Sequence, residues 1–294
     1  MIRKCLFPVA GYGTRFLPAT KAIPKEMLPI LTKPLIQYGV EEAVEAGCVT
    51  MAMVTSKYKK AIEDHFDTHI DIETSIAGSS KEKLLEGVNG LIDVCRFSYT
   101  RQQEMKGLGH AILTGESLIG REPFAVILPD DLCVGEDVGV GFGGQDLGVG
   151  FRDQGVGDGV LMQMMEIHAQ YPEHCIVAVE KIPKEDSNKY GVIDGKHIDA
   201  SLIRVNNMVE KPDPAEAPSD LAIIGRYILT PEIFDVLRTT LPGKGGEIQI
   251  TDALLTLAKQ GKVLAYRFEG RRFDCGSVDG FVEATNFFYK KFRG

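Results

Sequence analysis

The sequence has no hydrophobic run long enough to cross a membrane, which takes about 20 apolar residues. Its amino terminus also lacks the apolar core of a secretory signal peptide, so we expect a cytoplasmic protein with no membrane partner. Basic residues are also fewer than acidic ones, with 33 Lys and Arg against 41 Asp and Glu. The net charge of −8 argues against a nucleic-acid partner, which would require clustered Lys and Arg. A nucleotide site needs only two or three local cations and stays open.

Close cysteine pairs are absent as well. The six cysteines are isolated and form no C-x-x-C, a spacing that favours reduced, mostly buried thiols. The remaining composition, 44% hydrophobic and 25% charged, is ordinary for a soluble globular protein. At 294 residues the chain can form one large α/β domain or two small ones, and no linker divides it.

Apolar strands and amphipathic helices alternate along the first half of the chain. Residues 5–9, 49–55 and 124–128 are typical of buried strands, and 35–47 and 57–66 of helices. Alternation of this kind predicts an α/β fold, Rossmann-like, with a mixed, mainly parallel central sheet and helices on both faces. We predict a single domain over residues 1–294 that ends in a helix at about 278–292.

The segment at about 135–159 differs from the rest, with ten glycines in 25 residues. It contains a nine-residue repeat, 137–145 followed by 146–154, and two copies are too few to stack into a solenoid. We interpret it as a duplicated, inserted surface loop, since glycine is costly to order. A lid over the neighbouring site is a less favoured interpretation.

The stretch that follows the first strand predicts a phosphate site. Gly11-x-Gly13 lets backbone N–H groups approach an anion, and Arg15 and Lys25 add two positive charges. A Rossmann dinucleotide motif would need a third glycine and an immediate helix. Here four prolines follow within residues 18–34, and each interior proline would cost a helix about 3 kcal/mol. We therefore expect a long, stiff loop around a nucleoside triphosphate and reject an NAD-dependent oxidoreductase.

Two further clusters follow predicted strands. Residues 101–111 lie between a strand and a helix, and Asp130 and Asp131 end the strand 124–128. In parallel sheets ligands bind beyond the carboxyl ends of the strands, so we expect one active site at this edge. Asp130 could simply end the strand in a turn. An acidic residue at this place favours a Mg²⁺ ligand instead.

The run Gly11-x-Gly13-Thr14-Arg15-x-x-Pro18-x-Thr20-x-x-x-Pro24-Lys25-Glu26, with 28–38 after it, resembles the sugar-1-phosphate nucleotidyltransferases and in particular their uridylyl-transferring branch. The resemblance runs from about residue 3 to about 285, apart from the glycine-rich segment. It implies that UTP and α-D-glucose 1-phosphate react, with Mg²⁺ as cofactor, to give UDP-glucose and pyrophosphate. It also implies a homodimer or homotetramer.

The resemblance also implies roles for individual residues. Arg15 would hold the β- and γ-phosphates, Lys25 would lie near the α-phosphate, and Lys211 would bind the sugar phosphate. The metal would be held by Asp130 and, with a weaker match, by Asp274. Expected nucleotide-binding residues are Ala10, Gly11, Gly13, Thr14, Gln102 and Gly107, and expected sugar-binding residues are Gly191, Glu210 and Lys211.

Two other functions stay open on the sequence. A thymidylyl or dual-specificity enzyme would use the same chemistry, although the runs 26–29 and 106–111 favour the uridylyl branch. A catalytically inactive UDP-sugar sensor would have lost one of the residues that bind phosphate or metal. Here all of them are present: Arg15, Lys25, Asp130 and Lys211.

Overall fold

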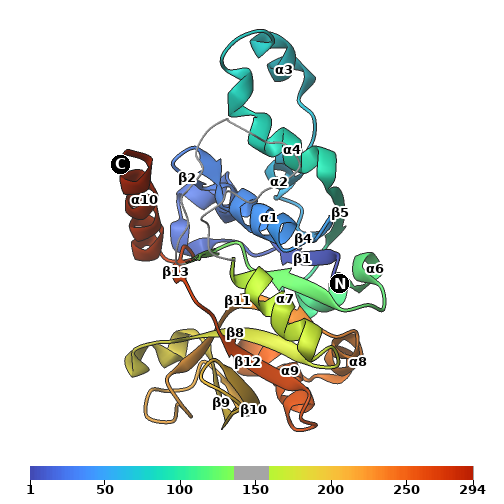
Figure 1. Cartoon of the computed structure of the whole chain (residues 1–294), viewed down its shortest axis with the longest axis vertical. Helices are drawn as coiled ribbons and strands as arrows, with labels where there is room; N and C mark the ends of the chain where they lie inside the picture. The colour runs from blue at the N-terminus through green and yellow to red at the C-terminus, as the bar shows by residue number, and fades with distance from the viewer. Residues whose placement is uncertain (136–158, 294) are drawn as a thin grey trace.

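The computed structural model describes residues 1–135 and 159–293 (Figure 1). Its strands are β1 (Lys4–Pro8), β2 (Pro29–Ile30), β3 (Lys33–Pro34), β4 (Thr50–Thr55), β5 (Arg96–Arg101), β6 (Phe124–Ile127), β7 (Asp131–Val134), β8 (Cys175–Lys181), β9 (Gly191–His197), β10 (Leu202–Glu210), β11 (Leu221–Leu229), β12 (Val263–Arg267) and β13 (Arg271–Asp274). Its α-helices are α1 (Leu35–Glu45), α2 (Lys60–His65), α3 (Ile70–Ile76), α4 (Glu86–Val94), α5 (Leu108–Thr114), α6 (Glu116–Ile119), α7 (Val160–Gln170), α8 (Glu232–Thr239), α9 (Ile250–Ala258) and α10 (Val278–Arg293).

A nine-stranded sheet in the order β5-β4-β1-β6-β11-β8-β12-β10-β9 forms the centre of the molecule. β5, β4, β1 and β6 are parallel, which places their carboxyl ends at one edge, as the alternating sequence predicts. From β11 onward most pairings are antiparallel. The predicted mixed sheet with helices on both faces is confirmed. Its parallel part is concentrated in the first half of the chain.

The second half of the sheet curves until it closes on itself. β9, the last strand of the sheet, pairs again with β11 through Leu221–Ile193 and Ala222–Val192. β11, β8, β12, β10 and β9 therefore form a closed ring of hydrogen-bonded strands, at the lower end of Figure 1. Closure of this kind leaves the ring with no free edge.

Helices cover both faces of the sheet and create two apolar cores. One face packs α1 and α7 over strand residues such as Cys5 and Ile176, and the other packs α5, α8 and α9 over residues such as Leu6 and Val177. Neighbouring residues of one strand thus point into different cores, as the strand period of two requires. Buried Arg226 of β11 joins the sheet to α1 through Glu42, with Nη2 2.7 Å from Oε2.

A small antiparallel sheet of β7 and β13 is decisive for the site, and the sequence did not predict either strand. Its register places Asp274 opposite Asp131, 143 positions earlier in the chain. α10 follows β13 and packs Phe281, Phe287 and Phe288 against a third apolar cluster with β2, β7 and β13. The predicted C-terminal helix is confirmed and lies to one side of the sheet (Figure 1).

Other predictions can be compared element by element. The proline-rich loop contains three short 3₁₀ turns and no α-helix, as expected. The helix predicted over 57–66 is shorter, and α3 was not predicted. The inserted segment at about 135–159 lies almost entirely outside the described residues, so its interpretation as a loop or lid stays a prediction.

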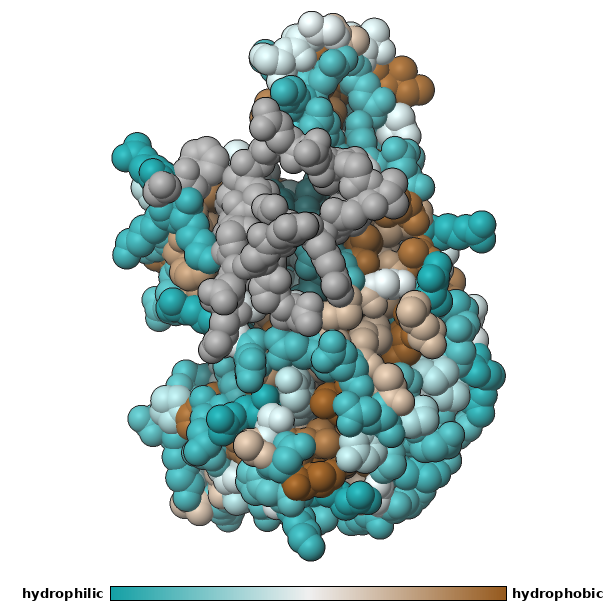
Figure 2. Space-filling view, viewed as in Figure 1, coloured by the Kyte–Doolittle hydropathy of each residue, from teal (hydrophilic) through white to brown (hydrophobic). Residues whose placement is uncertain are grey.

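The cysteines and the surface agree with the composition. All six cysteines are free, and all except the half-buried Cys133 are buried. Within the described residues, no helix is long and apolar enough to cross a membrane. In Figure 2 the part of the face that is not grey is largely hydrophilic, with hydrophobic residues in separate small patches.

Candidate active site

The loop after β1 folds back on itself around Gly13. This glycine adopts φ 67°, and a Cβ here would lie 3.0 Å from Cβ of Lys25, so a side chain would be both strained and crowded. The Thr20 hydroxyl donates to the Gly13 carbonyl at 2.7 Å and holds the turn. The loop thereby brings Lys25 beside the first strand and frames a cavity of about 220 Å³ lined by Gly13, Thr14, Arg15, Phe16, Lys25, Asp130 and Gly276.

Lys25 and Asp130 form an ion pair in this cavity, with Nζ 2.6 Å from Oδ2. Burial alone would raise the pKa of Asp130, but the Lys25 ammonium outweighs it and, with Arg15, holds that pKa below the usual range. Burial likewise opposes the charge of Lys25, yet Asp130 and Glu26 raise the pKa of Lys25. Both groups are therefore charged at neutral pH, and the cavity presents one carboxylate between cations.

Asp274 approaches the same place from β13. A Cβ on Gly276 would lie 3.0 Å from Oδ2 of Asp130 and 3.0 Å from Oδ1 of Asp274, with the Arg15 guanidinium 3.5 Å away. Only a residue without a side chain leaves the space between the two carboxylates open. Two converging carboxylates completed by water and phosphate oxygens are the ligands that Mg²⁺ prefers. The described residues contain no cluster of three or more protein ligands, so substrate would have to complete the coordination.

Asp131 has a different environment from its neighbour Asp130. It accepts from the Gly225 N–H at 2.7 Å and from Nε of Arg272 at 2.7 Å, and it is buried. Arg272 also reaches Glu180 at 2.5 Å, and its guanidinium lies 4.9 Å from the centre of the Tyr190 ring. Asp131 thus serves the fold, whereas Asp130 lines the cavity.

Tyr190 and Arg272 lie between the cavity and the segment of Glu210 and Lys211, and the sequence analysis assigned no role to either. The Tyr190 hydroxyl donates to Oδ2 of Asp274 at 3.0 Å, and the Tyr190 carbonyl accepts from the Lys211 N–H at 2.9 Å. The period of two in residues 271–274 could have indicated a strand with Arg272 and Asp274 on one side. Nothing in the sequence pairs that strand with β7.

A buried ion pair anchors the proline-rich loop to the segment before α2. Lys59 lies 2.6 Å from Glu26, and both side chains are almost fully buried. Burial raises the pKa of Glu26 and lowers the pKa of Lys59, and each partner opposes the shift of the other. This pair ties the residue after Lys25 to the amino-terminal side of α2. It was not predicted, although Glu26 belongs to the motif that carries the family resemblance.

Gln102 lies at the end of β5, at the same sheet edge. Its backbone N–H donates to Thr55 at the end of β4, while the Val9 N–H donates to Val54, so the first and second predicted clusters meet across β4. The Gln102 amide Nε2 lies 3.2 Å from the Gly107 carbonyl and 2.9 Å from Nδ1 of His110. In this orientation its Oε1 has no hydrogen-bond partner among the described residues.

The glycines of the second cluster have a structural reason of their own. Gly107 has φ 94°, and a Cβ there would lie 2.7 Å from Cβ of Glu247. A Cβ on Gly109 would lie 2.7 Å from the Ile248 carbonyl, which accepts the Gly109 N–H at 2.9 Å. Close packing against residues 247–248 therefore explains these glycines without a ligand. Ala10 is buried at the end of β1, and Gly11 has open space around it.

The predicted sugar-binding residues lie together at the start of β9 and the end of β10. Gly191 pairs with Glu210, and a Cβ on Gly191 would lie 3.3 Å from Oε2 of that carboxylate. The buried Thr251 hydroxyl donates to the same oxygen at 2.7 Å, and Lys211 lies 3.1 Å from Oε1. Lys211 itself has φ 47°, a strained conformation for a residue with a side chain. Thr251 holds Glu210, a role that its place in a helix first turn did not reveal.

A sequence profile of the nucleotidyl transferase family matches residues 8–140 and 151–291, nearly the whole chain. The chain belongs to this family. A curated relative, the UTP–glucose-1-phosphate uridylyltransferase of Pseudomonas aeruginosa, is 59% identical over 291 residues, which cover 99% of this chain and 97% of the relative.

Solved structures of the family agree. The crystal structure of apo UDP-glucose pyrophosphorylase superposes with a TM-score of 0.89 at 55% identity, covering 99% of each chain. A UDP-glucose pyrophosphorylase complexed with UDP-glucose gives 0.86 at 53% identity, covering 99% of this chain and 100% of the other. The family resemblance inferred from the opening loop is confirmed.

Proposed function

We propose that this protein transfers the uridylyl group of UTP to α-D-glucose 1-phosphate, forming UDP-glucose and pyrophosphate. The observation that carries the proposal is the cavity of Arg15, Lys25 and Asp130, joined through Asp274 and Tyr190 to the Glu210–Lys211 end. The names of relatives at 59% and 53% identity support this reaction over other members of the family.

The reaction needs positioning and charge stabilisation more than proton transfer. An ionised phosphate oxygen of glucose 1-phosphate attacks the α-phosphorus of UTP and forms a new P–O bond. The bond from that phosphorus to the bridging oxygen breaks, and pyrophosphate leaves with the electron pair. No general base is required, because the nucleophile is already ionised at neutral pH. In this scheme Arg15 neutralises the leaving pyrophosphate, Lys25 the α-phosphate, and Lys211 the attacking phosphate.

Asp130 and Asp274 would hold the Mg²⁺ ion beside Gly276, since their oxygens converge on a space that no side chain fills. When bound, the ion would neutralise charge on the phosphate oxygens and make the α-phosphorus more electrophilic. Lys25 neutralises Asp130 through Oδ2, the same oxygen that a Cβ on Gly276 would approach. The protein's own contribution is to fix these carboxylates: Tyr190 and the Gly276 N–H each donate to Asp274, at 3.0 and 3.1 Å.

Base and sugar would be read by residues outside the cavity lined by Arg15 and Asp130. Gln102 offers Oε1 as an acceptor for the N3–H of uracil, because its amide group is turned towards Gly107 and His110. Glu210, held by Thr251, offers carboxylate oxygens to sugar hydroxyls. Thymine presents the same N3–H, so this contact alone would not reject dTTP.

For the assembly of the protein, we propose the homodimer or homotetramer that the resemblance implies.

Pyrophosphate release from the purified protein tests the proposal. The assay contains glucose 1-phosphate and Mg²⁺ with UTP, dTTP, ATP, CTP or GTP, and a parallel series contains EDTA. We expect rapid release with UTP and none with EDTA. A Lys25→Met variant should lose activity, while a Lys259→Met variant, at the exposed residue that follows α9, should keep it.

The possible results separate the alternatives. Release that is equal or faster with dTTP would assign the protein to thymidylyl or dual-specificity enzymes with the same mechanism. Full activity in EDTA would refute the metal assignment. No release with any nucleotide, together with binding of UDP-glucose, would favour the sensor.

A further inference from the structure

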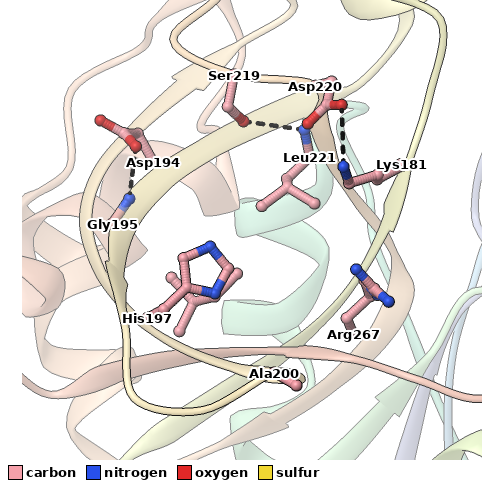
Figure 3. Close-up of a pocket in the computed structure, with 10 residues that line it drawn as sticks. Lys181, Asp194, Gly195, His197, Ala200, Ser219, Asp220, Leu221 and Arg267 are labelled. Atoms are coloured by element: carbon pink, nitrogen blue, oxygen red, sulfur yellow. Dashed lines mark hydrogen bonds and ion pairs between the residues drawn. The ribbon is translucent and has the colours of Figure 1, made fainter.

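A second cavity lies away from the active site, at one end of the closed ring of strands. It measures about 230 Å³ and is lined by Lys181, Asp194, Gly195, His197, Ala200, Ile203, Ser219, Asp220, Leu221 and Arg267. Figure 3 shows these side chains around an opening, with Lys181 and Arg267 on one side and Asp194 and His197 on the other. None of these residues lines the cavity of Arg15 and Asp130.

The topology of the ring explains why basic side chains meet here. Lys181, His197 and Arg267 are the last residues of β8, β9 and β12. β10 and β11 begin at the same rim, and the register pairs Leu221 with Lys181 and Ile203 with His197. Mouths of closed strand rings are frequent ligand sites, because the ring end leaves backbone and side chains around a concave floor.

The three basic groups differ in how far neighbouring side chains engage them. The side chains of Arg267 and His197 make no hydrogen bond or ion pair to any residue in the described part of the chain. Asp199, the acidic residue in the turn after His197, caps the Ser201 and Leu202 N–H groups at 2.8 and 2.7 Å and also interacts electrostatically with His197. Arg267 is therefore the one uncommitted basic group among these lining residues. Lys181 contacts Asp220 at 3.7 Å, a long ion pair. In a chain of net charge −8, the uncommitted Arg267 guanidinium at this mouth is a specific anion-binding feature.

The other lining groups restrict the kind of anion. Ile203 and Leu221 belong to the apolar core and form a floor for a non-polar surface. Asp194 and Asp220 supply carboxylate acceptors for hydroxyl groups. A cavity of this size with basic, acidic and apolar walls fits a phosphorylated sugar better than an inorganic ion. The guanidinium of Arg267 suits a phosphate group because it can donate two parallel hydrogen bonds.

We infer that the mouth of this ring is a second ligand site, which binds a small phosphorylated sugar through Arg267, His197 and Lys181. The site is independent of the proposed reaction and of its residues. It stands on the cavity, on the convergence of three strand ends and on the uncommitted Arg267 side chain.

Calorimetric titration tests the site. Protein saturated with UDP-glucose and Mg²⁺, so that the active site is filled, is titrated with glucose 6-phosphate and separately with inorganic phosphate. We expect saturable binding of glucose 6-phosphate, with a Kd at least about tenfold higher in Arg267→Ala and in His197→Ala, since each removes one hydrogen bond to a charged group. Both residues are exposed, so the variants should fold and keep their basal turnover.

Arg204→Ala is the matched control. Arg204 is an exposed arginine on β10, and it does not line the cavity. It should bind both probes as the wild type does. Tighter binding of glucose 6-phosphate than of phosphate supports a sugar phosphate, and equal binding of the two overturns that specificity. Isotherms of the Arg267→Ala and His197→Ala variants that match the wild type would overturn the site itself, whether or not the enzyme is active.

Discussion

Asp130 and Asp131 are adjacent in sequence, but asparagine at 131 should lower the stability whereas asparagine at 130 should lower the turnover. Asp131 is buried and receives hydrogen bonds from Gly225 and Arg272. An asparagine side chain is neutral, so it could not replace the carboxylate as the charged acceptor of both hydrogen bonds. Its NH₂ group would also point at one of the two donors. Breaking one side of a buried ion pair costs about 3–5 kcal/mol. Arg272 keeps Glu180, so we expect about 3 kcal/mol for Asp131→Asn.

That loss corresponds to roughly 6–12 °C in the unfolding temperature, at about 2–4 °C per kcal/mol for a large domain. Asp130→Asn should behave differently, because its partner Lys25 stays partly accessible and its own negative charge is removed from beside Asp131 and Asp274. Its unfolding temperature should stay within a few degrees of the wild type. Its turnover should fall about 10²–10³-fold, the usual cost of removing one electrostatic element of a transition state.

Two assays on the same preparations decide the matter. Circular dichroism during heating gives the unfolding temperature, and pyrophosphate release with UTP and glucose 1-phosphate gives the turnover. Glu180→Gln serves as the companion variant, since it removes the other partner of Arg272. Its effect should be non-additive with that of Asp131→Asn. Wild-type stability of Asp131→Asn, combined with the turnover loss expected of Asp130→Asn, would refute the division of roles.

Three further predictions concern other parts of the site. Lys211→Ala should cripple turnover and leave UTP binding largely intact, measured by calorimetry; equal loss of both would mean that its role is misassigned. Gly276→Ala should raise the Mg²⁺ concentration needed for half-maximal rate at least severalfold, because the added Cβ would lie 3.0 Å from both carboxylates; an unchanged Mg²⁺ titration would contradict the proposed metal position. Partial burial, then the charge of Lys106, lowers the pKa of His110 below its usual 6.5, and the neutral ring accepts from Gln102. The KM for UTP should therefore rise, and stability fall, as pH drops below 6.5 through that lowered pKa; a flat KM–pH profile, or one that His110→Gln does not alter, would rule this out.

The sequence determined the parts of the protein that depend on local chemistry. Continuous apolar runs specified the parallel strands β1, β4 and β6, because burial of a strand on both faces demands such a run. Gly13, Arg15, Lys25 and Asp130 could be named as neighbours, and they line one cavity, since loops after parallel strands meet at one edge. Prolines in the first loop excluded a helix, and the structure contains none there.

Tertiary structure decided whatever depends on pairing between distant segments. Asp274 reaches Asp130 only because β13 pairs with β7, and strands of four residues carry too little pattern to fix a partner. Tyr190, Thr251 and Arg272 gained their roles in the same way, through contacts across 41 to 141 positions. The second cavity exists only because the ring of strands closes through β9 and β11. Lys181, His197 and Arg267 are ordinary strand ends in the sequence, and a one-dimensional pattern contains no information on the curvature that joins β9 to β11.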